Sequence, residues 1–447
     1  MTQTLKAPVE RTERRPRRRR PVRRFMVVSH RWLSLVLGLV LLVITTSGGL
    51  LLYRPELERV LAGPAYEPSH HAVAVTLPQA REIVAQAHPS FEATGVWYEH
   101  GVYRVTDDTT SWAVDPGTGR ILGHVGETPS WLGFLQNLHE CFLSCEGDPG
   151  YLSWLNQPIS HTGWLGDDGA DVTGGSLVLG VFGLLLLYLS LTGIWLWFPR
   201  PSRWRSSMSV RWKRGRFARD TDLHKVAGMI AIPALLLWAV TGAGFELSFM
   251  EKAWYAVTPG SERSYADPVS AKAPKGTPDI GLAHAAQAAQ ALHPDADLVY
   301  AGLPVKGDAT SAYTFWFSDG FDPYGQTQYP GDLGVGVDRH TGRASDYYGG
   351  PGEATAQVLW DQWSYPAHAG YVVNGWWRLV WTLFAFAPLL LAITGISTWL
   401  VRRSTKRRRR RAARTHEPAT VPTEVAEVVR EDPETDPELA AALDEER

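Results

Sequence analysis

The sequence predicts an α-helical membrane protein with four transmembrane helices in two parallel repeats, each repeat carrying an extracytoplasmic α+β domain. Three observations indicate this fold class: four long apolar runs, basic blocks beside them, and motifs that recur in the same order in both halves. The net charge of −2 over 447 residues hides this sorting of charges along the chain. An apolar content of 45% excludes an intrinsically disordered chain, and two cysteines exclude a small disulfide framework.

The four apolar runs are each long enough to cross about 30 Å of hydrocarbon as a helix. They are residues 25–53, 176–198, 226–249 and 376–401. A secretory signal peptide has one short apolar stretch followed by a cleavage site, so four long runs argue against such a signal. We therefore expect four transmembrane helices, with the lipid bilayer as the first partner of the chain.

Basic residues concentrate in three short blocks beside these runs. Residues 1–24, 199–219 and 402–414 hold 27 of the 44 Lys and Arg residues. The positive-inside rule places all three blocks, and hence both termini, in the cytoplasm. The acidic segments 55–175 and 248–375 then lie outside. An Arg-rich N-terminus also occurs in nucleic-acid-binding arms, but here every basic block flanks an apolar run, so we expect no nucleic-acid partner.

These assignments divide the chain into nine segments. In order they are a basic cytoplasmic N-terminus (1–24), a first span (25–54), a first extracytoplasmic domain (55–175), a second span (176–198), a basic cytoplasmic loop (199–222), a third span (223–249), a second extracytoplasmic domain (250–375), a fourth span (376–401) and a cytoplasmic tail (402–447). The tail is first basic and then acidic and rich in Pro and Ala, which predicts disorder.

The two halves of the chain share a series of motifs. His30 lies 18 residues before Gly48, and His224 lies 18 residues before Gly242. The second and fourth spans share a Thr-Gly-Ile sequence, at residues 192–194 and 394–396. Both outer segments share a Val-Asp-x-x-Thr-Gly-Arg heptapeptide, at residues 114–120 and 337–343. Because each half contains an even number of spans, the halves form a parallel repeat, related by an axis along the membrane normal.

Each outer segment has the pattern of a small α+β unit. Residues 77–87 and 282–292 have helical periodicity, and each helix is followed by a His-Pro break. Alternating strands follow, at residues 101–106, 111–114 and 312–317. We find no hydrolase triad, phosphate loop or nucleotide-binding fingerprint in either segment.

Together these motifs resemble the PepSY-associated transmembrane proteins, a group that includes bacterial iron-regulated membrane proteins and ferric-siderophore reductases of the inner membrane. The resemblance rests on the His-Arg-Trp start of the first span, the paired Thr-Gly spans and the recurring heptapeptide, and it covers residues 25–402. It implies two extracytoplasmic PepSY domains on a four-helix unit in the bacterial cytoplasmic membrane. In the reductase branch it also implies haem held by histidines.

Histidines in or beside the spans indicate haem independently of the resemblance. His30 and His224 occupy equivalent positions near the cytoplasmic ends of the first and third spans. An ionisable residue there is costly and usually has a partner and a function. Two neutral imidazoles from neighbouring helices are the ligands of a bis-histidine haem iron. The alternative is that each His starts a helix and binds headgroups or backbone.

A second set of histidines lies on the outer side. His368 precedes the fourth span, and its counterpart is either His139, which the family pattern favours, or His161, whose local sequence is more similar. Two haem b groups at different depths would relay electrons across the membrane. Cys141 and Cys145 follow His139 in an oxidising compartment, so we expect a disulfide between them; a Cys–His metal site is the alternative.

The leading functional hypothesis is a haem-dependent oxidoreductase that reduces an extracytoplasmic ferric complex. No cytoplasmic connection is long enough for a nicotinamide or flavin domain, so electrons would come from membrane quinol or a separate cytoplasmic reductase. The alternative is a non-enzymatic membrane protein whose outer domains bind or regulate an extracytoplasmic protein such as a peptidase. An accessory subunit of a metal transporter is a third possibility. We identify no catalytic residue beyond the haem ligands.

Overall fold

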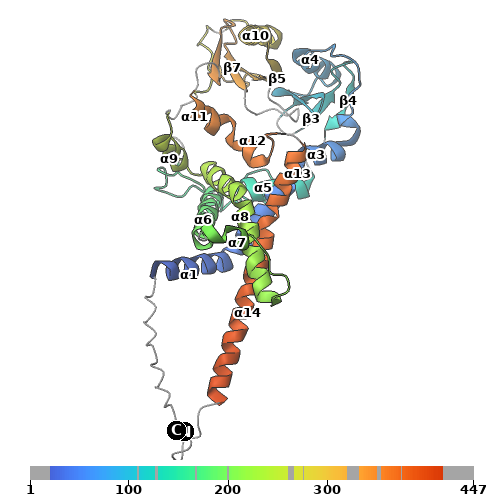
Figure 1. The fold of residues 1–447 in the computed structure, drawn as a ribbon. Coiled ribbons are helices and arrows are strands. Elements are labelled where there is room, and N and C mark those ends of the chain that lie inside the picture. Colours follow the sequence, from blue (N-terminus) through green and yellow to red (C-terminus); the bar gives the residue numbers. More distant parts are fainter. Residues whose placement is uncertain are drawn as a thin grey trace, which may run out of the picture.

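The protein, described here as a computed structural model, has a sheet domain at one end and a helical bundle at the other (Figure 1). The structure describes residues 21–107, 110–125, 129–166, 169–198, 201–259, 266–274, 276–319, 332–349, 354–373 and 375–415. Most of the predicted basic N-terminus and the acidic part of the tail, residues 1–20 and 416–447, lie outside the described residues. We call the end of the bundle nearest the sheet the sheet end, and the opposite end the far end.

The bundle contains the helices that are long and apolar enough to cross a membrane. Among the described residues, three helical stretches meet this criterion. They are α6 (Gly174–Trp197), α8 (Gly215–Gly244) and the stretch that joins α13 (Gly375–Ala385) to α14 (Ala387–Thr415). Helices satisfy their backbone hydrogen bonds internally, which an apolar environment requires. The described chain is thus a membrane protein with three such helices, or four if the bent pair α1 and α2 counts as one span.

The predicted first span is bent rather than straight. Helices α1 (Pro21–Val36) and α2 (Gly38–Leu51) meet at an angle of 64°. The break lies at Leu37 and Gly38, and glycine costs a helix about 1 kcal/mol relative to alanine, so the helix breaks easily at this point. In Figure 1, α1 runs across the bundle near its far end instead of along it. The first span predicted at residues 25–54 thus contains a bend.

The sheet domain is a single antiparallel sheet, with the strand order β4-β3-β2-β1-β5-β6-β7-β8 among the described residues. The strands are β1 (Gly95–Glu99), β2 (Val102–Thr106), β3 (Ser111–Val114), β4 (Ile121–Val125), β5 (Asp297–Gly302), β6 (Tyr313–Ser318), β7 (Leu333–Val337) and β8 (Ala344–Tyr348). Strands β1 and β5 join the two groups, with Val96 opposite Ala301 and Trp97 opposite Tyr300. The two α+β units therefore share one sheet, which the sequence analysis does not predict.

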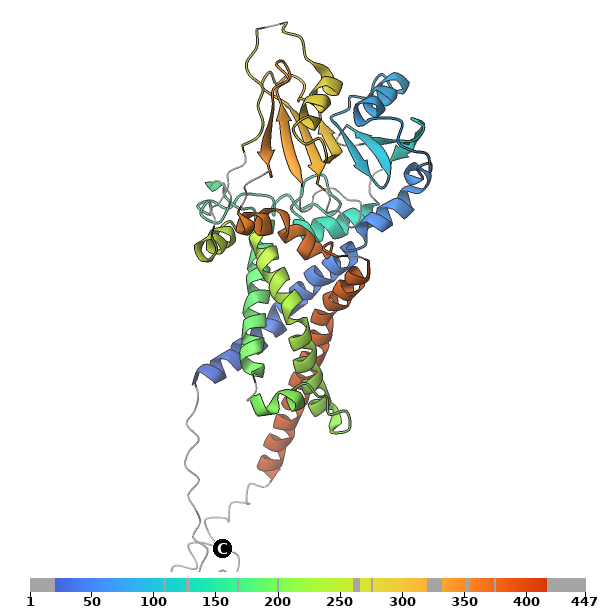
Figure 2. The same cartoon turned by 45° about the horizontal axis from the view of Figure 1, so that its top comes forward.

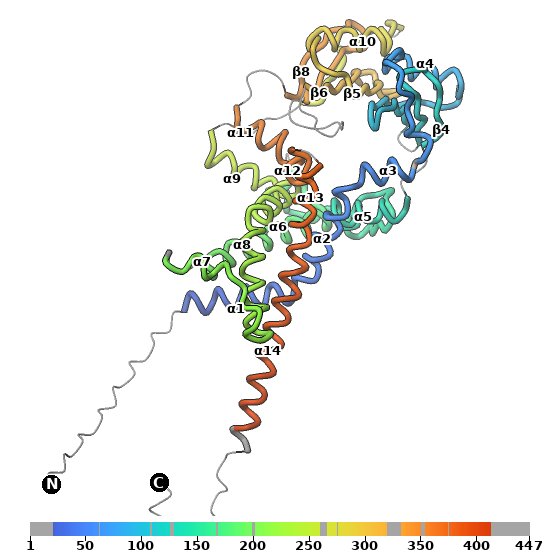
Figure 3. The backbone as a smooth tube through the Cα atoms, turned by 45° about the vertical axis from the view of Figure 1, so that its right-hand side comes forward, coloured from blue at the N-terminus to red at the C-terminus, as the bar shows by residue number. Residues whose placement is uncertain are grey.

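Two helices cover the face of the sheet that points away from the bundle (Figure 3). They are α4 (Leu77–Ala87) and α10 (Gly281–Gln290), close to the two helices predicted from periodicity. Val84 and Ala285 on these helices and Val96 and Phe315 in the sheet belong to one buried cluster. Burial of apolar surface stabilises this shared core by about 25 cal/mol for each Å² removed from water. The sheet domain therefore forms one unit over the bundle.

A layer of short helices connects the sheet domain to the bundle (Figures 1 and 2). It contains α3 (Arg54–Ala62), a 3-10 turn (Gly63–Tyr66), α5 (Ser130–Glu140), α9 (Phe249–Val257), α11 (Thr355–Gln357), a π-helical turn (Val358–Gln362) and α12 (Ser364–Ala369). At the far end lie a 3-10 turn (Pro201–Arg203) and α7 (Trp204–Ser207). A disulfide joins Cys141 to Cys145 directly after α5. This layer carries two of the predicted site histidines to the sheet end of the bundle.

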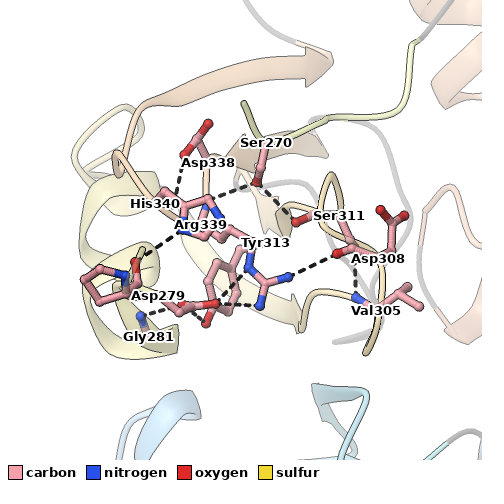
Figure 4. A network of polar contacts seen from close by, with 11 residues as sticks. Ser270, Asp279, Gly281, Val305, Asp308, Ser311, Tyr313, Asp338, Arg339 and His340 are labelled. Carbon is pink, nitrogen blue, oxygen red and sulfur yellow. Dashed lines mark hydrogen bonds and ion pairs between the residues drawn. The ribbon is translucent and has the colours of Figure 1, made fainter. Parts of the chain in front are cut away.

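The recurring heptapeptides form turns built around an aspartate. Asp338 accepts a hydrogen bond from the backbone amide of Ala271 at 2.6 Å, and others from amides in its own turn. Next to it, Arg339 donates to Asp279 at 2.9 Å (Figure 4). Asp115 holds the first heptapeptide in the same way, through amides at 3.1 and 3.4 Å. The heptapeptide is therefore a structural turn of the sheet domain.

Candidate functional site

Two histidines lie beside each other at the sheet end of the bundle. His139 is near the end of α5 and His368 is near the end of α12, and their ring centroids are 6.1 Å apart with the planes inclined by 50°. The sequence left His139 and His161 as alternative partners for His368. The structure brings His139 to this position, whereas His161 is exposed in a loop before α6. We call His139 and His368 the sheet-end pair.

The His139 ring packs against α2 of the bundle. Its Nδ1 lies 2.8 Å from the carbonyl oxygen of Ile44 and 3.4 Å from the hydroxyl oxygen of Ser47. A carbonyl oxygen only accepts hydrogen bonds, so Nδ1 must carry the proton. A side-chain carbon at Gly48 would overlap the ring. Glycine at this position therefore allows the ring to lie directly on the helix backbone.

His368 is held by residues from two other helices. Its Nδ1 lies 2.7 Å from the hydroxyl oxygen of Thr241 on α8, and its ring lies against Gly242. Its backbone carbonyl accepts hydrogen bonds from the indole N–H groups of Trp238 at 2.9 Å and Trp381 at 3.1 Å. Because Trp238 lies on α8 and Trp381 on α13, these bonds anchor α12 to both helices and define the position of the ring.

The far end of the bundle carries a second set of histidine contacts. His30 Nδ1 lies 2.8 Å from the hydroxyl oxygen of Thr192 on α6. His224 Nδ1 lies 3.1 Å from the hydroxyl oxygen of Thr394 and 3.0 Å from the carbonyl oxygen of Leu391, both on α14. The two histidines are within electrostatic reach of each other. We call His30 and His224 the far-end pair.

Burial favours the neutral form of both histidines of the sheet-end pair. Burial lowers the pKa of His139, and burial together with the neighbouring His139 lowers the pKa of His368 to about 3. A neutral imidazole has one protonated nitrogen and one with a free lone pair, which is the form that binds a metal. Within the described part of the chain, neither Nε2 atom has a hydrogen-bond partner. Both lone pairs are thus available to a ligand.

A cavity of about 670 Å³ adjoins the sheet-end pair, and both histidine rings line it. Leu, Ile and Phe side chains of α2 and α6 form much of its wall within the bundle. Charged groups line it toward the sheet, including Arg54, which pairs with Glu58 at 2.6 Å, and Arg104, which pairs with Glu99 at 2.8 Å. An apolar cavity of this size with a few convergent polar groups is typical of a cofactor site.

His139 and His368 would suit a haem iron as ligands. Their ring centroids lie 6.1 Å apart, so one metal ion could bind a nitrogen of each imidazole. A bare metal ion needs more ligands, and the described residues gather no cluster of three or more His, Cys, Asp or Glu that could hold one. The donor set therefore suits a macrocycle, which supplies the remaining ligands itself.

A comparison with known protein families agrees with this architecture. The sequence profile of the family described as the PepSY-associated TM region matches residues 28–402. The chain belongs to this family. The match spans all four histidines of the two pairs and both groups of strands, and it confirms the resemblance seen in the motifs. No curated protein sequence matches this PepSY-associated protein significantly.

The hydroxyl groups that contact the four histidines were not predicted from the sequence. They belong to Ser47, Thr192, Thr241 and Thr394. Each of them directly precedes a glycine in an apolar run, and this recurring pair was visible in the sequence. A glycine beside Ser or Thr in an apolar helix is typical of close helix packing. In the structure a histidine ring, rather than only a neighbouring helix, lies against it.

Proposed function

We propose that this PepSY-associated protein is a haem-containing transmembrane electron-transfer protein that reduces an extracytoplasmic substrate, such as a ferric siderophore or another ferric complex. The observation that carries the proposal is the sheet-end pair, whose ring centroids lie 6.1 Å apart and whose side chains line a cavity of about 670 Å³. A haem iron between two imidazoles gains and loses single electrons. His139 and His368 would hold one haem b, and His30 and His224 a second.

The bundle geometry supports two sites at different depths. The sheet-end pair receives its hydroxyl contacts from α2 and α8 near their ends closest to the sheet. The far-end pair receives its contacts from Thr192, near the opposite end of α6, and from Thr394 in α14. A single haem cannot transfer electrons between the two faces of a hydrocarbon layer about 30 Å thick. One site near each face removes this difficulty.

The proposed topology has four spans in two parallel repeats, with α1 and α2 counted together as the first span. The contact of His30 with Thr192 recurs as that of His224 with Thr394, as a repeat requires. Basic residues of α14 lie at the far end, which the positive-inside rule assigns to the cytoplasm. The sheet domain would then lie outside the bacterial cytoplasmic membrane, with both termini inside.

The electron donor would be membrane quinol or a separate cytoplasmic reductase. The connection between α6 and α8, residues 198–214, is too short to contain a nicotinamide or flavin domain. The substrate would approach from the sheet side, where the charged residues of the cavity lie. The neutral imidazoles and apolar walls would exclude water from the bundle part of the cavity.

An absorption spectrum of the purified protein tests the proposal. Full-length protein expressed with sufficient haem and purified in mild detergent should show a Soret band and the spectrum of a low-spin bis-histidine haem. His139→Ala and His368→Ala should each remove about half of the haem, since each leaves one site intact. His161→Ala is the matched control, because this exposed residue lies outside both pairs, and it should retain all haem.

A protein without a Soret band would refute the proposal. The non-enzymatic alternative, in which the sheet domain binds another extracytoplasmic protein, would then be the better interpretation. Loss of haem in His161→Ala but not in His139→Ala would refute the ligand assignment at the sheet end while leaving haem binding itself intact.

A further inference from the structure

Each of the four histidines contacts a hydroxyl group from a Ser-Gly or Thr-Gly pair on another helix. The pairs are Ser47-Gly48 for His139, Thr192-Gly193 for His30, Thr241-Gly242 for His368 and Thr394-Gly395 for His224. In every case the glycine lies next to the imidazole ring, because a side-chain carbon there would stand within 4 Å of it. One arrangement therefore serves all four rings, in both pairs.

The direction of these hydrogen bonds follows from the hydroxyl groups themselves. Thr192, Thr241 and Thr394 each donate the hydroxyl proton to the backbone carbonyl four residues earlier in their own helix, at 2.7–2.8 Å. Ser47 donates to the carbonyl of Ile44 at 2.8 Å. With its proton engaged, a hydroxyl group can offer the ring only a lone pair. The ring must therefore donate, and the proton must reside on Nδ1.

Backbone carbonyls require the same tautomer at two of the four rings. The His139 Nδ1 lies 2.8 Å from the Ile44 carbonyl oxygen, and the His224 Nδ1 lies 3.0 Å from the Leu391 carbonyl oxygen. A carbonyl oxygen has no proton to give. Two independent kinds of acceptor thus assign the proton to Nδ1 and leave the Nε2 lone pair free.

We propose that Thr192 and Thr241 are positioning residues that hold His30 and His368 in the Nδ1-protonated tautomer and so present Nε2 to iron. Backbone carbonyls do the same for His139 and His224. The inference deepens the proposed function and rests on it for the identity of the ligand. A hydrogen bond from the ring nitrogen that does not bind the metal orients an imidazole ligand and makes its other nitrogen a stronger electron-pair donor to the metal. At Gly48 the missing side chain lets the His139 ring come close to the helix backbone, whereas a side-chain carbon at the other three glycines would make only an ordinary contact.

The four hydroxyl groups are not equally important, and this difference predicts which substitutions change the tautomer. His139 and His224 have a backbone carbonyl as a second acceptor. Among the residues that the structure describes, His368 has only Thr241 at its Nδ1, and His30 has only Thr192. Removal of Thr241 or Thr192 should therefore release the tautomer, whereas removal of Ser47 or Thr394 should not.

The tautomer can be measured without haem. Full-length protein carrying ¹⁵N-labelled histidine, prepared in detergent without haem, reports by NMR which ring nitrogen of each site histidine is protonated. The wild-type protein should show protonated Nδ1 and unprotonated Nε2 at His368. Thr241→Val should shift His368 toward a mixture of tautomers, Thr241→Ser should restore the wild-type pattern, and Ser47→Ala should leave His139 unchanged.

Reconstitution with haem gives the second readout. Thr241→Val should weaken haem binding at the sheet-end site roughly 10- to 100-fold, as loss of an outer hydrogen bond does at other metal sites. It should also raise the reduction potential of that haem, because a weaker donor stabilises ferric iron less. Ser47→Ala is the matched control, with binding and potential close to wild type.

The two readouts separate failure of this inference from failure of the proposed function. Protonated Nε2 at His368 in the wild-type protein, or an unchanged tautomer in Thr241→Val, would overturn the positioning role even if haem binds. A wild-type protein with the expected tautomers that fails to bind haem would overturn the assignment of iron as the ligand. Equal effects of Thr241→Val and Ser47→Ala on haem binding would indicate a general packing role and also overturn the inference.

Discussion

Substitution of Gly48 and Gly242 by alanine makes the clearest prediction about the sheet-end site. Both glycines lie in helices, beside the rings of His139 and His368, respectively. A side-chain carbon at Gly48 would lie 2.7 Å from Nε2 and 3.0 Å from Nδ1 of His139 and would overlap the ring itself. The corresponding carbon at Gly242 would lie 3.5 Å from the nearest atom of His368, which is an ordinary contact.

The energies of the two substitutions should therefore differ in sign. Alanine in place of glycine stabilises a helix by about 1 kcal/mol. At Gly242 little opposes this gain, so Gly242→Ala should be neutral or slightly stabilising and should retain haem. At Gly48 the His139 ring must move, which loses its hydrogen bond to Ile44, worth about 0.5–1.5 kcal/mol, and adds an overpacking cost of about 1–3 kcal/mol.

The assay is the ratio of haem to protein in the two purified variants, together with thermal unfolding in the same detergent. Gly48→Ala should lose the sheet-end haem, about half of the total, while Gly242→Ala keeps both. Full retention of a low-spin bis-histidine spectrum in Gly48→Ala would show that His139 is not held on α2 as described. Equal haem loss in both variants would refute the conclusion that a side-chain carbon is tolerated beside His368 but not beside His139.

Two further predictions concern the sheet domain and the layer beneath it. Burial alone would raise the pKa of Asp338, but hydrogen bonds from backbone amides lower this pKa to about 2. The wild-type protein should therefore keep this stabilisation above pH 4 and lose on the order of 1–2 kcal/mol of unfolding free energy as the pH falls toward 2. Unfolding followed across that pH range should show no such dependence in Asp338→Asn. Replacing Cys141 and Cys145 together by serine should cost about 2 kcal/mol, because the closed loop is short; calorimetry measures this loss, and a destabilisation equal to that of unfolding the whole sheet domain would contradict it.

The sequence alone determined the membrane class, the family and the histidines worth considering. Apolar runs, basic blocks and turn motifs are local properties, so their meaning does not depend on the rest of the fold. The helix at Leu77–Ala87 and the strand at Ser111–Val114 were predicted at the residues where the structure has them. Periodicity and turn residues are sufficient to predict such elements, because the pattern marks the face that each element buries.

The tertiary structure alone decided which groups meet. The sequence favoured His139 and kept His161 as an alternative, and only the packing of α5 against α2 brings His139 to His368. The fusion of two domains through β1 and β5 and the hydroxyl partner of each imidazole likewise depend on contacts between distant segments. Sequence spacing specifies which residues share a helix face, but hydrogen bonds between helices are specified by how those helices pack. The site is therefore a property of the assembled bundle.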